Sequence, residues 1–446
     1  MMKMIIVMLF MFLFTLFNKK LMFFYNFIYL MSFMNLFKIM YKEEIYQTIS
    51  FFFGLDLYSY FMLMLSLWIL SLSFMIIDNK LKFYKDYKEK LFVFLFMLII
   101  LIIFFASLNL LLFYLMFELS LIPMFVMVIY WGFNYERVSA AYYLLMYTMF
   151  ISMPLFIYLF KLLKFYGSFD LILLMIEKIS LDWGVWDYMV LFMAFYIKLP
   201  IYIFHVWLPK AHVEAPVYGS MILAAILLKL GSYGLLRFFK MFMFISVKYN
   251  YLIFSVGMIG SLIMSFVCLI QIDMKKLVAY SSVVHMNILL CSLLTLKNLG
   301  TISAYILMIS HGLCSSGLFF MVNLYYERSL SRLMFLNKGM MSVFFSLSFW
   351  WFILCVTNFS FPFSLNFFSE IFMINVIISW EMMMMIMIMM ICFFSSAYSL
   401  YLYSYIQYGL ICFEEKFFMV YIKDLMVLYI HISPLFLFIF NLNLFY

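Results

Sequence analysis

The sequence contains few charged residues and few residues that interrupt helices. Aspartate, glutamate, lysine and arginine together make up 11% of the 446 residues, and there are 14 glycines and 7 prolines. Soluble globular proteins carry about 25% charged residues. A chain that is 69% hydrophobic, with a mean hydropathy of +1.14, cannot bury so much apolar surface in a water-soluble core. The composition therefore excludes a soluble globular protein and predicts a polytopic membrane protein.

The sequence also lacks the motifs that bind redox cofactors and nucleotides. There is no CxxC pair, and the six cysteines are each at least 20 residues apart, at Cys268, Cys291, Cys314, Cys355, Cys392 and Cys412. We interpret them as small buried hydrophobic residues. No GxGxxG sequence or P-loop is present, and the close glycine pairs Gly231/Gly234 and Gly257/Gly260 are typical of helix packing. We therefore expect no flavin, iron–sulfur cluster or nucleotide in this chain.

A metal site and a nucleic-acid site are also poorly supported. His205, His212 and Glu214 lie close together, but there is no HExxH motif and prolines would disrupt a shared helical face. We expect no metal site, and we leave the role of His205 undecided. The net charge of +8 is spread over loops such as 78–90, so no basic block indicates nucleic-acid binding.

Apolar runs between charged residues predict about fourteen transmembrane helices in a single membrane domain, 1–446. Each must be helical, because lipid offers no partner for free backbone groups. The predicted spans are 4–17, 21–37, 57–77, 91–107, 110–130, 139–160, 188–207, 217–236, 249–270, 277–296, 302–325, 340–380, 382–408 and 425–446.

Two of these spans should be broken helices. One break is expected near Pro200, and the other near Pro362, within a run of residues 340–380 that is too long for one straight span. The second run fits either one broken helix or two spans. Broken segments at corresponding places in two halves indicate a transporter with inverted repeats, although a proline kink without a function is the alternative. We assign 1–90 to N-terminal helices, 91–236 and 249–408 to two half-channel repeats, and 425–446 to a C-terminal helix.

Four ionisable residues lie deep within apolar runs: Glu118, Lys198, Lys229 and Glu370. Each costs about 2.5–3.5 kcal/mol if it faces the centre of a bilayer. They should therefore face the protein interior or a hydrated path, where each charge needs a partner. A glutamate–lysine pair that can separate is a proton switch, because an unpaired buried charge tends to be neutralised by a proton.

Two histidines in apolar spans, His285 and His311, could connect such charges, since histidine titrates near physiological pH. Both could instead be hydrogen-bonded packing residues. Glu370 could instead cap the helical segment after Pro362.

The other two charges also have structural alternatives. Lys229 could extend its ammonium group to the membrane interface. Glu118 could form a purely structural pair with a lysine or with Arg137. The abundant methionines and phenylalanines are expected to face lipid.

The stretch that follows Pro200 should return to the membrane edge. We predict a short interfacial turn between Pro209 and Pro216, in which Lys210, His212 and Glu214 are loop residues.

Five stretches resemble, in order, the antiporter-like membrane subunits of proton-pumping NADH:quinone oxidoreductase, respiratory complex I. They are FELSLIPMFVMVIYWG, KLPIYIFHVWLPKAHVEAPVYGSMILAAILLKLGSYGLLR, QIDMKKLVAYSSVVHMN, SHGLCSSGLFFMVNLYYERSLSR and FPFSLNFFSE. The resemblance covers about 110–400, and KAHVEAPVxGSMILA is similar to the mitochondrial subunit 4 branch of that family. Tyr218 departs from the small residue that is usual there.

The resemblance implies a proton-transfer role for the buried ionisable residues, in the order Glu118, Lys198, Lys229, His285, His311 and Glu370. The first two would be the pair of the first half-channel, and the third would pass protons toward the centre. The histidines would lie on a connecting hydrophilic axis, and the last glutamate would serve the exit.

The resemblance further implies that the activity, NADH:ubiquinone reduction coupled to proton translocation, belongs to a whole complex. Flavin, iron–sulfur clusters and quinone would lie in partner subunits. Expected partners are other membrane-arm subunits, including neighbouring antiporter-like subunits and a lateral helix from the subunit 5 relative, together with lipids but not nucleic acid. A composition rich in Phe, Met and Tyr fits an A/T-rich organelle genome, which points to the mitochondrial inner membrane. The alternatives are an Mrp-type cation/proton antiporter subunit and a structural subunit that does not pump.

Overall fold

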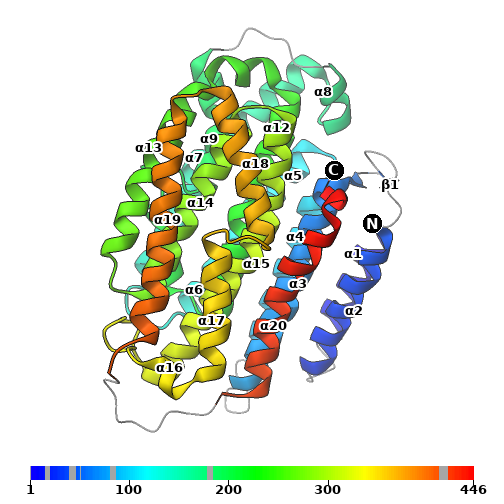
Figure 1. Ribbon diagram of the computed structural model, residues 1–446. Helices are drawn as coiled ribbons and strands as arrows, with labels where there is room; N and C mark the ends of the chain where they lie inside the picture. Colours follow the sequence, from blue (N-terminus) through cyan, green and yellow to red (C-terminus); the bar gives the residue numbers. More distant parts are fainter. Residues whose placement is uncertain are drawn as a thin grey trace. The chain divides into compact units, whose positions relative to one another are not determined.

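The chain folds into helices, with one short hairpin, in two compact units (Figure 1). The computed structural model describes residues 2–15, 21–39, 47–50, 52–80, 87–177, 184–410 and 420–445. The first unit comprises Met1–Lys198 with Glu214–Lys248, and the second comprises Leu199–Val213 with Tyr249–Tyr446. Cys412 and part of the predicted loop 78–90 lie outside the described residues.

Hydropathy and length identify the membrane-spanning helices. Over the described residues, ten helices are long and apolar enough to cross a membrane, and three more apolar helices are shorter, at Met4–Leu13, Phe345–Asn358 and Leu365–Trp380. The prediction of an all-helical polytopic protein is confirmed, and the expected number of about fourteen spans is roughly consistent with these helices.

The first unit contains the N-terminal helices and the hairpin. Its elements are α1 (Met2–Phe14), α2 (Leu21–Ile39), β1 (Gln47–Ser50), β2 (Phe53–Leu55), α3 (Leu57–Lys80), α4 (Tyr87–Ala106), α5 (Leu110–Leu119), α6 (Leu121–Trp131), α7 (Arg137–Tyr166), α8 (Leu171–Glu177), α9 (Val185–Lys198), α11 (Val217–Ile222), a π-helical turn (Leu223–Leu227) and α12 (Leu228–Met241). The two strands are antiparallel.

The second unit is arranged around the long helix α15, which packs against α14, α17, α18 and α20. Its elements are α10 (Trp207–Glu214), α13 (Met243–Ile270, which begins in the first unit), α14 (Met274–Leu294), α15 (Asn298–Ser329), α16 (Met340–Val343), α17 (Phe345–Asn358), α18 (Leu365–Trp380), α19 (Met384–Gln407), α20 (Ile422–Leu437) and a 3₁₀ segment (Phe438–Phe445). Four of the cysteines, Cys268, Cys291, Cys314 and Cys355, are buried, as expected for small apolar residues.

The predicted break near Pro200 is present, but the turn predicted after it is wrong. Helix α9 ends at Lys198, and the chain is not helical again until α10 begins at Trp207. The segment between Pro209 and Pro216 is mostly the helix α10 itself. Pro209 lies in the first turn of α10, where a missing N–H removes no helical hydrogen bond.

Two of the residues predicted to be in a loop at the membrane edge are buried. In α10, only Lys210 is exposed, whereas His212 and Glu214 point into the protein. The prediction failed because two prolines seven residues apart usually indicate a loop. Here they lie at the two ends of one short helix.

The second predicted break lies between α17 and α18, which follow one another along the bundle in Figure 1. Pro362 falls in this gap, and Ser360 and Phe363 there have positive φ angles of 62° and 69°. Ser364 caps α18 by accepting a hydrogen bond from the amide of Phe367. Glu370 lies in the second turn, so the interpretation of Glu370 as the helix cap is wrong.

A buried ion pair joins two distant parts of the first unit. The guanidinium of Arg237, in α12, donates hydrogen bonds to both carboxylate oxygens of Asp56, the residue before α3. Its Nε also donates to the Tyr233 hydroxyl at 2.9 Å. Burial alone would raise the pKa of the Asp56 carboxyl, but the charge of Arg237 holds that pKa below its ordinary value. The pair is therefore ionised at neutral pH and fixes the start of α3 against α12.

We predict that Arg237→Met destabilises the protein severely. The change leaves the Asp56 carboxylate buried without its counter-charge, which typically costs about 3–5 kcal/mol. Thermal unfolding of the purified protein in detergent measures this effect. Lys161→Met is the matched control, because it breaks a more exposed pair with Asp187 at 3.3 Å, where about 1 kcal/mol or less is expected. Equal shifts in the two variants would contradict the prediction.

Candidate functional site

The first unit brings Glu118 and Lys198 together from two helices. Glu118 lies in the last turn of α5 and Lys198 is the last residue of α9, and both are buried. The Lys198 ammonium donates a hydrogen bond to the carbonyl of Phe117 at 2.5 Å. It also lies 3.1 Å from the centroid of the Phe117 ring. The lysine is therefore held by the residue that precedes the glutamate.

Both residues of this pair lie at places where a membrane helix ends or is interrupted. Lys198 is the last residue of α9, and Glu118 lies two residues before the junction of α5 and α6 at Ser120. Pro123, in the first turn of α6, cannot donate to the carbonyl four residues before it. The carbonyl of Phe117 accepts hydrogen bonds from both the Ser120 hydroxyl and Lys198. Backbone acceptors at a helix junction thus partly replace the water that an ammonium loses on burial.

The Glu118 carboxylate is coupled to Lys198 through charge and not through a hydrogen bond. The opposite charges interact electrostatically, yet in the described structure no hydrogen bond joins either Glu118 oxygen to Lys198. Arg137 donates instead to the carbonyl of Gly132 at 3.1 Å, so it is not the structural partner considered for Glu118. The site is an ion pair whose members can separate without breaking a mutual hydrogen bond.

Lys229 lies directly after an irregular turn that the sequence did not predict. Residues Leu223–Leu227 form a π-helical turn in which the amide of Leu228 bonds to the carbonyl of Leu223. The widened turn lets the Lys229 ammonium reach back to the carbonyl of Ala224, at 2.5 Å. Lys229 is fully buried, so it does not extend to the membrane interface as the alternative proposed.

The second unit brings together His285, His311 and Glu370, from α14, α15 and α18. The Nδ1 atom of His285 lies 3.4 Å from a carboxylate oxygen of Glu370. The two imidazole rings have centroids 5.5 Å apart. Both histidines are buried, and the Glu370 side chain is 15% exposed. The sequence analysis singled out each of these three residues because it lies within an apolar run. In the structure they form one cluster.

Tyr398, in α19, is a member of this cluster that the sequence did not reveal. Its hydroxyl lies 3.2 Å from Nε2 of His285, on the ring edge away from Glu370. His285 can thus receive a proton on one ring nitrogen and release one from the other. The interpretation of His285 as only a packing residue is weakened, because both ring nitrogens face titratable groups. A buried tyrosine could not be singled out in a chain with 35 tyrosines.

The residues considered for a metal have other partners. His212 stacks on Phe319, with ring centroids 4.5 Å apart. Glu214 accepts a hydrogen bond from the Asn134 side chain at 3.0 Å. His205 lies in the gap between α9 and α10 and stacks on Tyr202. Among the described residues, no group of three His, Cys, Asp or Glu side chains could hold a metal ion.

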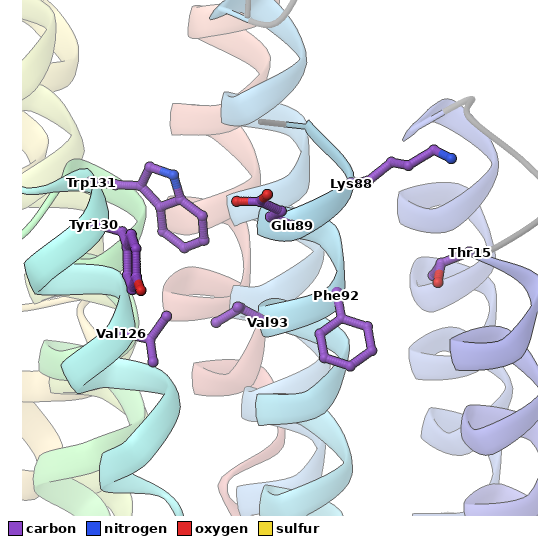
Figure 2. A pocket seen from close by; sticks show the side chains of 8 residues that line it. All are labelled: Thr15, Lys88, Glu89, Phe92, Val93, Val126, Tyr130 and Trp131. Carbon is purple, nitrogen blue, oxygen red and sulfur yellow. The ribbon is translucent and has the colours of Figure 1, made fainter. Parts of the chain in front are cut away.

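A hollow of about 400 Å³ lies among α1, α4 and α6 in the first unit. Figure 2 shows the residues that line it, which are Thr15, Lys88, Glu89, Phe92, Val93, Val126, Tyr130 and Trp131. Its walls are apolar, and Lys88 and Glu89 stand in the first turn of α4. None of the predicted proton-transfer residues lines this hollow, so it is a different kind of site.

Two family models match the chain. Residues 107–395 match the model described as NADH:quinone oxidoreductase/Mrp antiporter, TM. Residues 1–106 match the model described as NADH-ubiquinone oxidoreductase chain 4, amino terminus. Glu118, Lys198, Lys229, His285, His311 and Glu370 lie within the first of these matches, and Tyr398 lies just beyond its end.

Individual relatives agree with the family models. NADH-ubiquinone oxidoreductase chain 4 of Ceratitis capitata is 47% identical over 81% of this chain and 80% of its own length. The protein of the same name from Aedes aegypti is 42% identical over 97% of both chains. A chain of respiratory complex I from Thermus thermophilus has the same fold, with a TM-score of 0.86, 20% identity, and coverage of 97% of this chain and 94% of that one.

Proposed function

Because this chain belongs to the NADH-ubiquinone oxidoreductase chain 4 family, we propose that its two clusters of buried ionisable residues conduct protons through the membrane. The chain is a membrane-arm subunit of complex I, and its family is that of the proton-translocating, antiporter-like subunits. The predicted resemblance to the subunit 4 branch is confirmed. NADH:ubiquinone reductase activity belongs to the complex and not to this chain alone.

Several finer assignments are part of the proposal. Redox cofactors would reside in partner subunits, since no cofactor motif occurs in this sequence. The neighbours would be other membrane-arm subunits, including antiporter-like subunits and a lateral helix from the subunit 5 relative. The membrane would be the mitochondrial inner membrane, which the A/T-biased composition supports. We assign 91–236 and 249–408 to two half-channels, flanked by helices within 1–90 and 425–446.

The observation that carries the proposal is the pairing of charges inside an apolar helical protein. Burying Glu118, Lys198, Lys229 and Glu370 opposes insertion into the membrane by about 2.5–3.5 kcal/mol for each residue at the bilayer centre. Glu118 faces Lys198, and Glu370 faces His285. A structural subunit that did not pump would be more stable with apolar residues at these positions.

In the first cluster, the proposed step is a proton-controlled separation of charge. A proton binds to a Glu118 oxygen and forms an O–H bond, which removes the negative charge that stabilises the Lys198 ammonium. Lys198 then releases a proton from its Nζ, and its neutral amine stays near the carbonyl of Phe117. Loss of the proton from Glu118 restores the charge that favours protonated Lys198.

The later steps use the remaining residues. Lys229 would be the next carrier, with the carbonyl of Ala224 as one resting position for its ammonium. In the second cluster, His285 would accept a proton on one ring nitrogen and transfer another toward Glu370 from Nδ1. His311 would stand beside His285 as the other member of the hydrophilic axis.

We predict that Glu118→Gln and Lys198→Met each reduce coupled proton pumping by the intact complex by about tenfold or more, since each removes a positioned proton carrier. Proton translocation per electron in proteoliposomes, with the content of assembled complex, measures the effect. Lys210→Met is the matched control, because it removes the same charge from an exposed position in α10. Normal stoichiometry in both site variants of an assembled complex would refute the role of this pair.

We also propose that a phospholipid occupies the hollow shown in Figure 2. Phe92, Val93 and Val126 would contact an acyl chain, and the Lys88 ammonium would attract the headgroup phosphate. Tyr130 and Trp131 are residues typical of the membrane interface, which supports a position of the mouth of the hollow at headgroup level.

We predict that Val126→Trp fills the hollow and removes about one tightly bound phospholipid per complex, as measured by native mass spectrometry. The control is Val138→Trp, which adds the same bulk at an exposed position in α7 outside the hollow. An unchanged lipid count in the Val126 variant would show that the hollow holds no tightly bound lipid.

A further inference from the structure

His431 is a buried histidine that neither the sequence interpretation nor the proposed mechanism uses. It lies in α20 and is completely buried. Its ring stacks on Phe320 of α15, with centroids 6.4 Å apart and planes at 14°. A Cβ atom added to Gly317 would lie 2.8 Å from the Leu354 side chain of α17 and 3.6 Å from Cβ of His431, so the missing side chain makes room for Leu354 while His431 lies in ordinary contact distance of Gly317.

The hydrogen bonding of His431 determines which ring nitrogen carries the proton. Its Nδ1 lies 2.8 Å from the carbonyl oxygen of Val427. A carbonyl only accepts, so Nδ1 carries the hydrogen and Nε2 of the neutral ring is a free acceptor. Among the described residues, Nε2 has no hydrogen-bond partner. An unsatisfied buried acceptor costs about 1–3 kcal/mol, which favours a water molecule at this atom.

A second unsatisfied acceptor lies near the same part of α15. Asn366, in the first turn of α18, donates through Nδ2 to the carbonyl of Thr357 at 2.7 Å, and its Oδ1 has no partner within the described structure. The Thr357 hydroxyl lies 3.3 Å from Sγ of Cys314, which precedes Gly317 on α15 by three residues. Polar atoms therefore lie near residues 314–317 of α15 from two directions. One set belongs to the gap between α17 and α18, and the other is the ring of His431.

The seam between α15 and α20 continues this polar line in both directions. His311 precedes Gly317 by six residues, or about 9 Å along α15, and faces His285 of α14 from about a third of a turn around the helix. Asp424 precedes His431 by seven residues, two turns along the same face of α20, or about 10 Å. Asp424 pairs with Arg328 of α15 at 3.6 Å. Along α15, His311 therefore lies before Gly317, where His431 packs, and Arg328 with its partner Asp424 lies after it.

We propose that a hydrated proton branch leaves the cluster of His285, His311 and Glu370 along the α15–α20 seam, and that Nε2 of His431 is its proton acceptor. This inference rests on the proposed function. In the step, a hydronium ion that received its proton from the cluster loses one O–H bond and becomes neutral water while an N–H bond forms at Nε2, so the ring becomes an imidazolium. The imidazolium then returns that proton from Nε2 to a water nearer Asp424.

The Val427 carbonyl makes this relay different from that of His285. Since Nδ1–H stays bonded to the backbone, proton uptake and release both occur at Nε2. The ring cannot pass a proton through itself, so water molecules beside Nε2 must reorient between the two steps. The ionisable groups that face this route are His311, Asp424, Arg328 and Glu327, the last of which acts electrostatically on Asp424.

The test is His431→Gln in the intact complex, reconstituted in proteoliposomes. Glutamine retains a hydrogen-bond acceptor of similar reach but cannot carry a proton at Nε2. We expect proton pumping and coupled NADH oxidation to fall at least fivefold in an assembled complex. Ser433→Ala, a change of a half-buried polar residue on the same helix, should leave both rates within about twofold of normal.

Two further measurements make each outcome decisive. If His431 has only a structural role, the assembled His431→Gln complex should pump protons at the normal rate. That result would overturn the relay. If the variant does not assemble, density for water within hydrogen-bond distance of Nε2 in the native complex decides the question, and a dry site refutes the branch. Loss of pumping in Glu118→Gln with normal pumping in His431→Gln would refute this inference and leave the proposed function intact.

Discussion

The rest of the structure depends on how an ammonium group is kept inside a protein that offers it no bulk water. Lys198 and Lys229 solve this in the same way, by donating to a backbone carbonyl at an irregularity in a helix. For Lys198 the carbonyl belongs to Phe117, beside the junction of α5 and α6, and for Lys229 it belongs to Ala224, in a π-helical turn. At both lysines, carbonyl groups of irregular backbone thus replace part of the water that the ammonium group loses on burial.

This requirement explains which parts of the fold could be predicted from the sequence. Long apolar runs dictate helices, and prolines mark irregular backbone, so the breaks near Pro200 and Pro362 were predictable. The π-helical turn was not, because Leu223–Leu227 contains neither proline nor glycine and widens only to suit its surroundings. Helix α10 was mistaken for a turn because Pro209 is equally compatible with the first turn of a helix.

For the functional site, the sequence revealed individual residues but not which residues pair with each other. A charge within an apolar run is conspicuous, so Glu118 and Glu370 were found individually, but their partners depend on tertiary packing. Tyr398 stayed hidden because a buried tyrosine is ordinary until its hydroxyl is seen beside His285. The buried pair of Asp56 and Arg237 was missed because each residue lies near the end of an apolar run, where a charge usually reaches water.

The two clusters differ in a way that assigns them different physical tasks. Glu118 and Lys198 share no hydrogen bond, so the energy of their interaction changes chiefly with the charge that each carries. His285 instead has a partner at each ring nitrogen, which suits the transfer of a proton through the ring and not the storage of separated charge. If the clusters carry protons as proposed, the first would be the place where a change in local electric field is converted into proton release. The second, with a histidine that has a partner at each ring nitrogen, would on the same proposal conduct a proton through that ring.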